Sequence, residues 1–165
     1  MLLLTLKQDQ RPDIYILSLD STLFNVTKEL SIASAITPSW SPDGMKIAFN
    51  ARKPEDDEIA NIWVINRDGS QAQQLTFDDL VKYQLLWLPQ SNTIAYVAIS
   101  TDLDVAGLYI VDVASKETKQ VLKGPMSIAM SQNEDLLAFT PAFDYRDPKQ
   151  GEIYNQWCKS KFFDL

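Results

Sequence analysis

The sequence predicts an all-β fold, an incomplete β-propeller made of four-stranded units that repeat along the chain. One unit, residues 37–76, reads T-P-S-W-S-P-D-G-M-K-I-A-F-N, then a charged break, then N-I-W-V-I-N-R-D-G-S-Q-A-Q-Q-L-T. Imperfect copies of this unit fill nearly all of the remaining sequence, at a period typical of propeller blades. Its two central strands are apolar on consecutive residues, which is typical of strands covered on both faces.

Turn residues divide this unit into four strands. S-P-D-G at residues 41–44 is a tight turn, because Pro presets φ, Asp bonds its own backbone and Gly accepts φ > 0. An apolar strand is expected over residues 45–49, and another, rich in β-branched and aromatic residues, over 61–66. D-G at residues 68–69 is a hairpin signal, and residues 71–76 follow as a fourth, more polar strand. We therefore expect an antiparallel meander.

The copies divide the chain into four expected units, residues 1–36, 37–82, 83–124 and 125–165. The first unit begins at its second strand and the last ends near its third, so two full blades are flanked by two partial ones. Short polar or crossing segments are expected at residues 7–12 and 28–36. The other expected strands lie at residues 2–6, 13–17, 22–27, 83–88, 94–97, 107–111, 119–122, 137–139 and 151–154.

Two motifs keep the same register through these units. I-A-F at residue 47 recurs as I-A-Y at 94 and L-A-F at 137, at spacings of 47 and 43 residues. I-Y at residue 14 recurs at 62, 108 and 153 as I-W, L-Y and I-Y, at spacings of 48, 46 and 45. Two independent motifs with one period favour propeller blades over an ordinary β-sandwich.

Composition narrows the classes of function. The chain has 165 residues, 45% of them hydrophobic, and a net charge of −7, which suits one soluble globular domain and argues against nucleic acid as a partner. Its apolar runs are too short to cross a bilayer, and the opening M-L-L-L lacks the basic start and cleavage site of a signal peptide. Cys158 is the only cysteine, so no internal disulfide is expected, which fits a reducing compartment without excluding an oxidising one.

The chain contains no histidine. This removes the usual general base, Ser-His-Asp and Cys-His sites, and His-based zinc sites, although a carboxylate pair remains possible in principle. We expect no catalytic residue, no metal and no cofactor in this chain.

Strand connectivity sorts the loops into two faces. The 1–2 and 3–4 turns lie on one face, here called the turn face, and the longer 2–3 and 4–1 loops lie on the other, here called the loop face. Binding residues tend to lie on variable loops held by a rigid scaffold, so we expect the loop face to bind a partner. The candidate binding residues are Arg11, Asp56, Asp57, Asp102, Asp104 and Arg146.

Each candidate also has a simpler explanation. E-D-D-E at residues 55–58 resembles a Ca²⁺ ligand set but lacks EF-hand spacing, so a solvated acidic loop is favoured. Asp102 and Asp104 lack a third ligand at suitable spacing, and Arg146 forms either an internal ion pair with Asp147 or a partner contact. Core packing is favoured over a carbohydrate platform for the aromatic residues at motif positions, which are Trp40, Trp63, Trp87, Tyr15, Tyr109 and Tyr154.

The signature W-S-P-D-G-x-x-I-A-F … I-W/Y-V … D-G … L-T resembles the TolB-type propeller repeat, a relative of the WD-type repeat. Residues 40–76 carry it in full, whereas later copies replace Gly44 by Ser91 or Asn92 and Trp40 by Met130. The resemblance implies a six- or seven-bladed ring used mainly for protein binding, and a periplasmic location. Similar blades also adjoin the catalytic domain of prolyl-oligopeptidase-like hydrolases. We therefore expect a non-catalytic protein-binding scaffold or, alternatively, the propeller region of a larger hydrolase or lyase.

An open arc of blades exposes apolar faces and strand edges at both ends. Three arrangements would cover them: a longer protein of which this chain is a piece, two copies forming one eight-unit ring, or an arc that closes alone, which is the least favoured. Phe162 and Phe163 would cover an end face or, as we prefer, begin a further strand.

Overall fold

The computed structural model describes residues 1–8, 11–55, 59–89, 92–102, 104–124, 126–130 and 137–141. Several sequence predictions lie outside these residues. They are the strand expected at 151–154, the candidates Asp56, Asp57 and Arg146, and the roles considered for Asp147, Tyr154, Cys158, Phe162 and Phe163.

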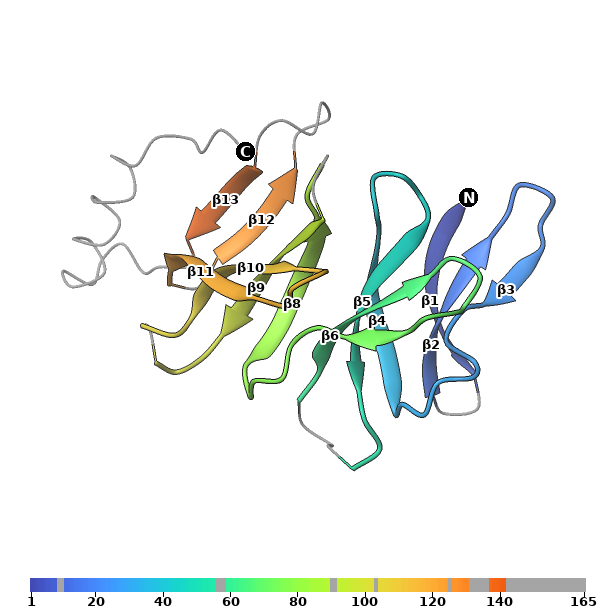
Figure 1. Cartoon of the computed structure of the whole chain (residues 1–165), viewed down its shortest axis with the longest axis horizontal. Helices are drawn as coiled ribbons and strands as arrows, with labels where there is room; N and C mark the ends of the chain where they lie inside the picture. Colours follow the sequence, from blue (N-terminus) through green and yellow to red (C-terminus); the bar gives the residue numbers. More distant parts are fainter. Residues whose placement is uncertain are drawn as a thin grey trace.

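The described residues form four antiparallel sheets in which neighbouring strands are consecutive in the chain (Figure 1). Blade 1 is β1-β2-β3, blade 2 is β4-β5-β6-β7, blade 3 is β8-β9-β10-β11 and blade 4 is β12-β13. The strands are β1 (Leu2–Gln8), β2 (Arg11–Leu17), β3 (Leu23–Asn25), β4 (Ser34–Trp40), β5 (Lys46–Arg52), β6 (Asn61–Asn66), β7 (Gln73–Gln74), β8 (Val81–Trp87), β9 (Thr93–Ile99), β10 (Gly107–Asp112), β11 (Thr118–Lys123), β12 (Met126–Met130) and β13 (Leu137–Pro141).

This arrangement confirms the predicted fold class, an all-β incomplete propeller in which two four-stranded blades are flanked by two partial ones. The predicted turn chemistry holds in blade 2. Gly44 has a φ of 67° and its N–H donates to the carbonyl of Ser41 at 2.8 Å, while Gly69 has a φ of 85°. Both glycines adopt a conformation that other residues reach only at a cost, which is why the turn residues could be recognised in the sequence.

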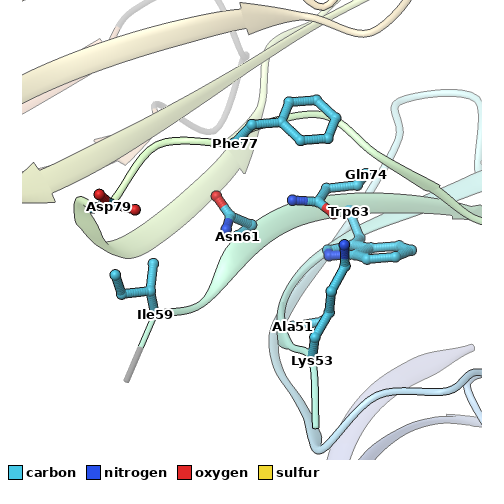
Figure 2. Close-up of a pocket in the computed structure, with 8 residues that line it drawn as sticks. All are labelled: Ala51, Lys53, Ile59, Asn61, Trp63, Gln74, Phe77 and Asp79. Atoms are coloured by element: carbon cyan, nitrogen blue, oxygen red, sulfur yellow. The ribbon is translucent and has the colours of Figure 1, made fainter. Parts of the chain in front are cut away.

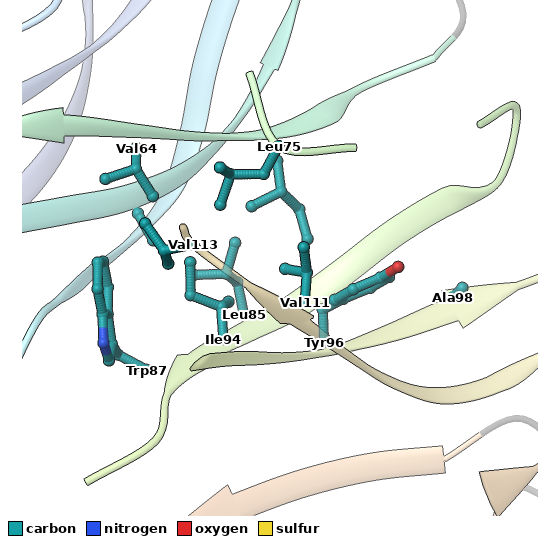
Figure 3. Packing of buried hydrophobic residues seen from close by; sticks show 11 residues of the cluster. Val64, Leu75, Leu85, Trp87, Ile94, Tyr96, Ala98, Val111 and Val113 are labelled. Atoms are coloured by element: carbon teal, nitrogen blue, oxygen red, sulfur yellow. The ribbon is translucent and has the colours of Figure 1, made fainter. Parts of the chain in front are cut away.

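Blade 2 is covered on both faces, as its consecutive apolar residues predict. Ile47, Phe49 and Ile65 pack in one cluster with side chains of blade 1. Residues with the opposite orientation, Ile62 and Val64 among them, pack in a second cluster with blade 3 (Figure 3). The blade 3 side chains of this second cluster are Leu85, Trp87, Ile94, Tyr96, Ala98, Val111 and Val113.

The described aromatic residues at motif positions are buried or half-buried, as core packing predicts, and all but Tyr15 pack in or against the clusters between blades. Tyr15 and Trp87 are buried. Trp40 and Trp63 are half-buried against the cluster between blades 1 and 2, and Tyr109 is half-buried against the one between blades 2 and 3. Tyr109 also stacks on Tyr96 with 5.5 Å between ring centroids, a geometry that aromatic pairs favour.

Two sequence predictions about connections are wrong in extent. The polar connection expected at residues 7–12 is mostly strand, because β1 continues to Gln8 and pairs there with Arg11 at the start of β2. The segment expected to cross between blades at residues 28–36 ends early, because β4 begins at Ser34.

Both four-stranded blades carry an irregularity at the same place in their first strand. The pairing of β4 with β5 shifts register between Ile36 and Ser39, and that of β8 with β9 shifts between Tyr83 and Leu86. Thr37 and Gln84, inside the two bulges, have φ values of 52° and 49°. Each strand continues through its bulge, and the strand expected at 83–88 already spans the bulge of β8.

Candidate functional site

The two predicted faces are present in blade 2. The turn face is formed where the β6–β7 hairpin meets the β4–β5 turn, since the N–H of Arg67 donates to the carbonyl of Met45 at 2.9 Å. At the opposite ends of the same strands lie the connection between β5 and β6 and the crossover between β7 and β8. These two connections form the loop face of the blade.

A pocket of about 220 Å³ opens on this loop face (Figure 2). In the view of Figure 2, the rings of Trp63 and Phe77 lie on one side and Asp79 lies on the other. Phe77 is 68% exposed, so its ring is accessible at the mouth of the pocket. The pocket is lined by Ala51, Lys53, Ile59, Asn61, Trp63, Gln74, Phe77 and Asp79.

Hydrogen bonds around Thr76 hold the polar wall of the pocket in place. The Thr76 hydroxyl accepts from the N–H of Ile62 and donates to the side-chain oxygen of Asn61, both at 2.9 Å. The carbonyl of Thr76 accepts from the Gln74 amide at 2.7 Å. Asn61 and Gln74 are therefore held by Thr76, just after β7, and do not fill the pocket.

Blade 1 repeats this hydrogen-bond arrangement with different side chains. The Thr27 hydroxyl accepts from the N–H of Ile14 at 3.1 Å and donates to Asp13 at 2.7 Å. Asp13 and Thr27 thus correspond to Asn61 and Thr76 of blade 2, and Arg11, two residues before Asp13, corresponds to Ile59.

Arg11 fills the loop-face end of blade 1 with its guanidinium. It forms an ion pair with Asp13, with 2.8 Å between Nη2 and Oδ1. It also donates to four carbonyls of the crossover between β3 and β4, those of Thr27 at 3.1 Å, Lys28 at 3.2 Å, Leu30 at 3.1 Å and Ile32 at 3.4 Å. Arg11 was predicted as a binding candidate, and these contacts give it an internal role that its sequence position did not reveal.

The charge of Asp13 is stabilised by the same contacts. Burial raises the pKa of its carboxyl, but hydrogen bonds from Arg11, Thr27 and Asn25, with the positive charge of Arg11, outweigh burial and lower the pKa below its ordinary value. The ionised carboxylate and the guanidinium therefore form one unit that ties the β3–β4 crossover to the start of β2.

The candidates Asp102 and Asp104 lie in the connection between β9 and β10 of blade 3, both exposed. The Asp102 side chain accepts from the N–H of Asp104 at 3.0 Å, and Asp104 pairs with Lys123 at 2.8 Å. The hydrogen bond and charge of Lys123 lower the pKa of Asp104. The two residues thus share one loop, in a different blade from the pocket.

The described part of the chain contains no group of three or more His, Cys, Asp or Glu side chains placed to hold a metal ion. Nor do its residues form a helix of the length and apolarity that spanning a membrane requires.

Sequence reasoning missed the pocket residues because their separate contexts are ordinary. Trp63 belongs to the repeat motif, Gln74 to a polar strand and Lys53 to a charged loop. The one available signal is Phe77, an aromatic residue directly after the L-T that ends a repeat unit, at the start of the crossover.

No protein-family model matches the chain, and no curated protein matches it significantly. Solved structures do. TolB from Acinetobacter baumannii aligns with a TM-score of 0.63 and 20% identity over 82% of this chain and 34% of that one. An oligogalacturonate lyase in complex with manganese aligns with a TM-score of 0.61 and 18% identity, over 83% of this chain and 38% of the lyase. The β-propeller domain of the trilobed protease from Pyrococcus furiosus aligns with a TM-score of 0.57 and 20% identity, over 83% of this chain and 42% of that domain.

The chain spans less than half the length of each of these three structures, and at such identities the likeness concerns the fold. The consecutive strand order within each blade and the structural similarity to TolB agree with the resemblance in the repeat signature. The chain therefore has a TolB-like β-propeller fold, in the form of an incomplete ring.

Proposed function

We propose that this chain is a non-catalytic scaffold that binds a protein partner through the loop face. The observation that carries the proposal is the pocket beside Phe77, because it places a large exposed aromatic ring next to a hollow on the face where the connections are longest. Aromatic residues in a pocket are typical anchor points of protein interfaces. The net charge of −7 favours a basic partner over an acidic one.

Photo-crosslinking tests this proposal with a matched pair of positions. Phe77 on the loop face is 68% exposed and Met45 on the turn face is 56% exposed, so a benzoylphenylalanine at either site is accessible. Irradiation of cells that produce each variant is expected to give a discrete adduct of defined mass from position 77 and none from position 45. Adducts from position 45 alone, or from neither position, would contradict the proposal.

The alternative is that the chain is the propeller region of a larger hydrolase or lyase. The structural similarity to an oligogalacturonate lyase, a dipeptidyl peptidase 4 and an acylaminoacyl peptidase favours it. The sequence of the full-length natural gene product separates the two: an extension with a G-x-S-x-G motif and a distal histidine supports a hydrolase. A product made only of further blades supports the scaffold.

We also propose that the chain associates with itself or with further blades at its open ends. Leu2 and Leu6 in β1 and Phe24 in β3 are exposed, although they lie in strands of a sheet. Among the described residues β1 pairs only with β2, so its other edge presents backbone groups without sheet partners.

A further inference from the structure

We propose that the loop-face pocket of blade 2 is a receptor for the guanidinium group of an arginine side chain presented by a protein partner. The inference rests on the proposed function, since it names the group that the loop face would recognise. It starts from the repeat itself, because blade 1 carries an arginine of its own at the corresponding place.

The corresponding positions are fixed by hydrogen bonds as well as by sequence. The hydroxyls of Thr27 and Thr76 make the same pair of hydrogen bonds. Each accepts from a backbone N–H, in β2 for Thr27 and in β6 for Thr76. Each also donates to the side chain one residue earlier, Asp13 or Asn61. Counting back two residues from Asp13 and Asn61 leads to Arg11 and Ile59. Ile59 lines the pocket, so the position that carries an arginine in blade 1 borders a hollow in blade 2 and has no guanidinium of its own.

Blade 2 does not need an internal arginine to hold its crossover. In blade 1 the Arg11 guanidinium binds the crossover carbonyls, but in blade 2 other residues bind them. Lys82, whose side chain is fully buried, donates to the carbonyls of Asp78 at 3.3 Å and Leu80 at 2.9 Å, and Gln74 donates to that of Thr76. An arginine of the chain's own is therefore not required to hold the crossover of blade 2.

The lining suits a planar cation. Trp63 and Phe77 supply aromatic faces, which attract Arg more often than Lys, and Asp79 supplies a carboxylate that a guanidinium can meet with two parallel hydrogen bonds. Phe77 already attracts a cation, since Lys116 Nζ lies 5.8 Å from its ring centroid. Lys53 is the one cation among the described lining residues, and its long, partly exposed side chain can move into solvent, as can that of Lys116 beside Phe77.

Lys53 makes the proposal sharply testable, because a guanidinium and a carboxylate ligand respond to its removal in opposite directions. The probe is N-acetyl-arginine amide, compared with N-acetyl-lysine amide and N-acetyl-glutamate amide. Binding to the whole chain is followed through the indole N–H resonances of its four tryptophans, with the Trp63 signal assigned by Trp63→Phe.

The arginine probe is expected to shift the Trp63 signal saturably and to bind more tightly than the other two. Asp79→Asn is expected to weaken binding of the arginine probe about fivefold, because it removes one exposed charge pair. Lys53→Gln is expected to strengthen binding about twofold, because it removes one charge repulsion. Phe77→Ser is expected to weaken binding about fivefold through loss of one cation–π contact. Phe77 and Asp79 are exposed, so unchanged urea midpoints are expected to show that these variants remain folded.

Three results would overturn the proposal: tighter binding of the glutamate probe, weaker binding of arginine to Lys53→Gln, or no saturable shift of the Trp63 signal by the arginine probe. The outcome is separate from that of crosslinking. Arginine binding without an adduct at position 77 leaves the pocket standing and removes the protein-binding proposal. An adduct at position 77 without arginine binding leaves the protein-binding proposal standing and removes the arginine receptor.

Discussion

At the scale of single residues, Arg11 shows how one side chain can replace several backbone contacts. The β3–β4 crossover has carbonyls that no strand pairs, and the guanidinium satisfies four of them while it neutralises Asp13. Arg11→Met is expected to destabilise the chain by about 3 kcal/mol, because it leaves the buried Asp13 charge uncompensated. Urea unfolding measures the free energy of unfolding of this variant and of the exposed-surface control Lys28→Met. An equal loss in both would show that the contacts of Arg11 with Asp13 and the crossover, here called the Arg11 clamp, do not stabilise the fold.

Asp13 makes the same clamp dependent on pH. Its pKa in the folded state is lower than in the unfolded chain, so its contribution is complete above the unfolded pKa and is lost as pH falls through the folded pKa. The difference in unfolding free energy between the natural chain and Asp13→Asn should therefore be constant at neutral pH and shrink below a pH of about 4. A difference that grows on acidification would contradict the assigned shift.

Two glycines distinguish backbone conformation from close packing. Gly44 has a φ of 67° with nothing within 4 Å of an added Cβ, whereas Gly107 combines a φ of 153° with a Cβ position only 2.0 Å from the carbonyl oxygen of Leu122. Gly44→Ala should cost about 1 kcal/mol, the cost of a left-handed conformation alone. Gly107→Ala should cost clearly more, because β10 and β11 must separate. Thermal unfolding of both variants checks the order, and equal losses would refute it.

At the scale of elements, the stability of each blade depends on the face that it shares with its neighbour. Leu75 and Ile94 are almost fully buried between blades 2 and 3 (Figure 3). Leu75→Ala or Ile94→Ala should each cost about 2 to 5 kcal/mol, since a cavity remains where the side chain was. Leu19→Ala is the control, because Leu19 is 97% exposed and its loss should be close to zero. If the buried variants unfold like the control, the blades do not rely on this interface.

At the scale of the whole molecule, the open edge of β1 is the feature to test. Leu2 and Leu6 are 57% and 37% exposed on this strand. We expect the mass from light scattering to rise with concentration, and the double variant Leu2→Lys, Leu6→Lys to suppress the rise, because charges on an edge strand oppose pairing. Leu19→Lys should leave it unchanged. A constant monomer mass for the natural chain would reject self-association.

The pocket depends on the whole molecule in a different way. It combines the end of β5, the start of β6, β7 and the crossover to blade 3, so its lining extends from Ala51 to Asp79 in the sequence. Its interpretation depends further on blade 1, where Arg11 occupies the matching region. Neither fact is visible in a single element.

The sequence by itself determined the blades. The S-P-D-G turn of residues 41–44, paired apolar strands and a repeat spacing of 43 to 48 residues are local patterns, and each follows from backbone sterics or from the burial of both sheet faces. This information was sufficient for the central strands of each blade and their order, but not for the bounds of every strand, since β4 begins at Ser34 within an expected crossing segment.

Only the tertiary structure decided what the loop face contains. The direction of the Arg11 guanidinium, the bulges at Thr37 and Gln84 and the hollow beside Phe77 depend on which side chains meet across sequence distances that no local pattern encodes. Propensity and periodicity describe a residue and its neighbours in the chain. A binding pocket is set by how separate segments leave space between them, and that is a property of the packed fold.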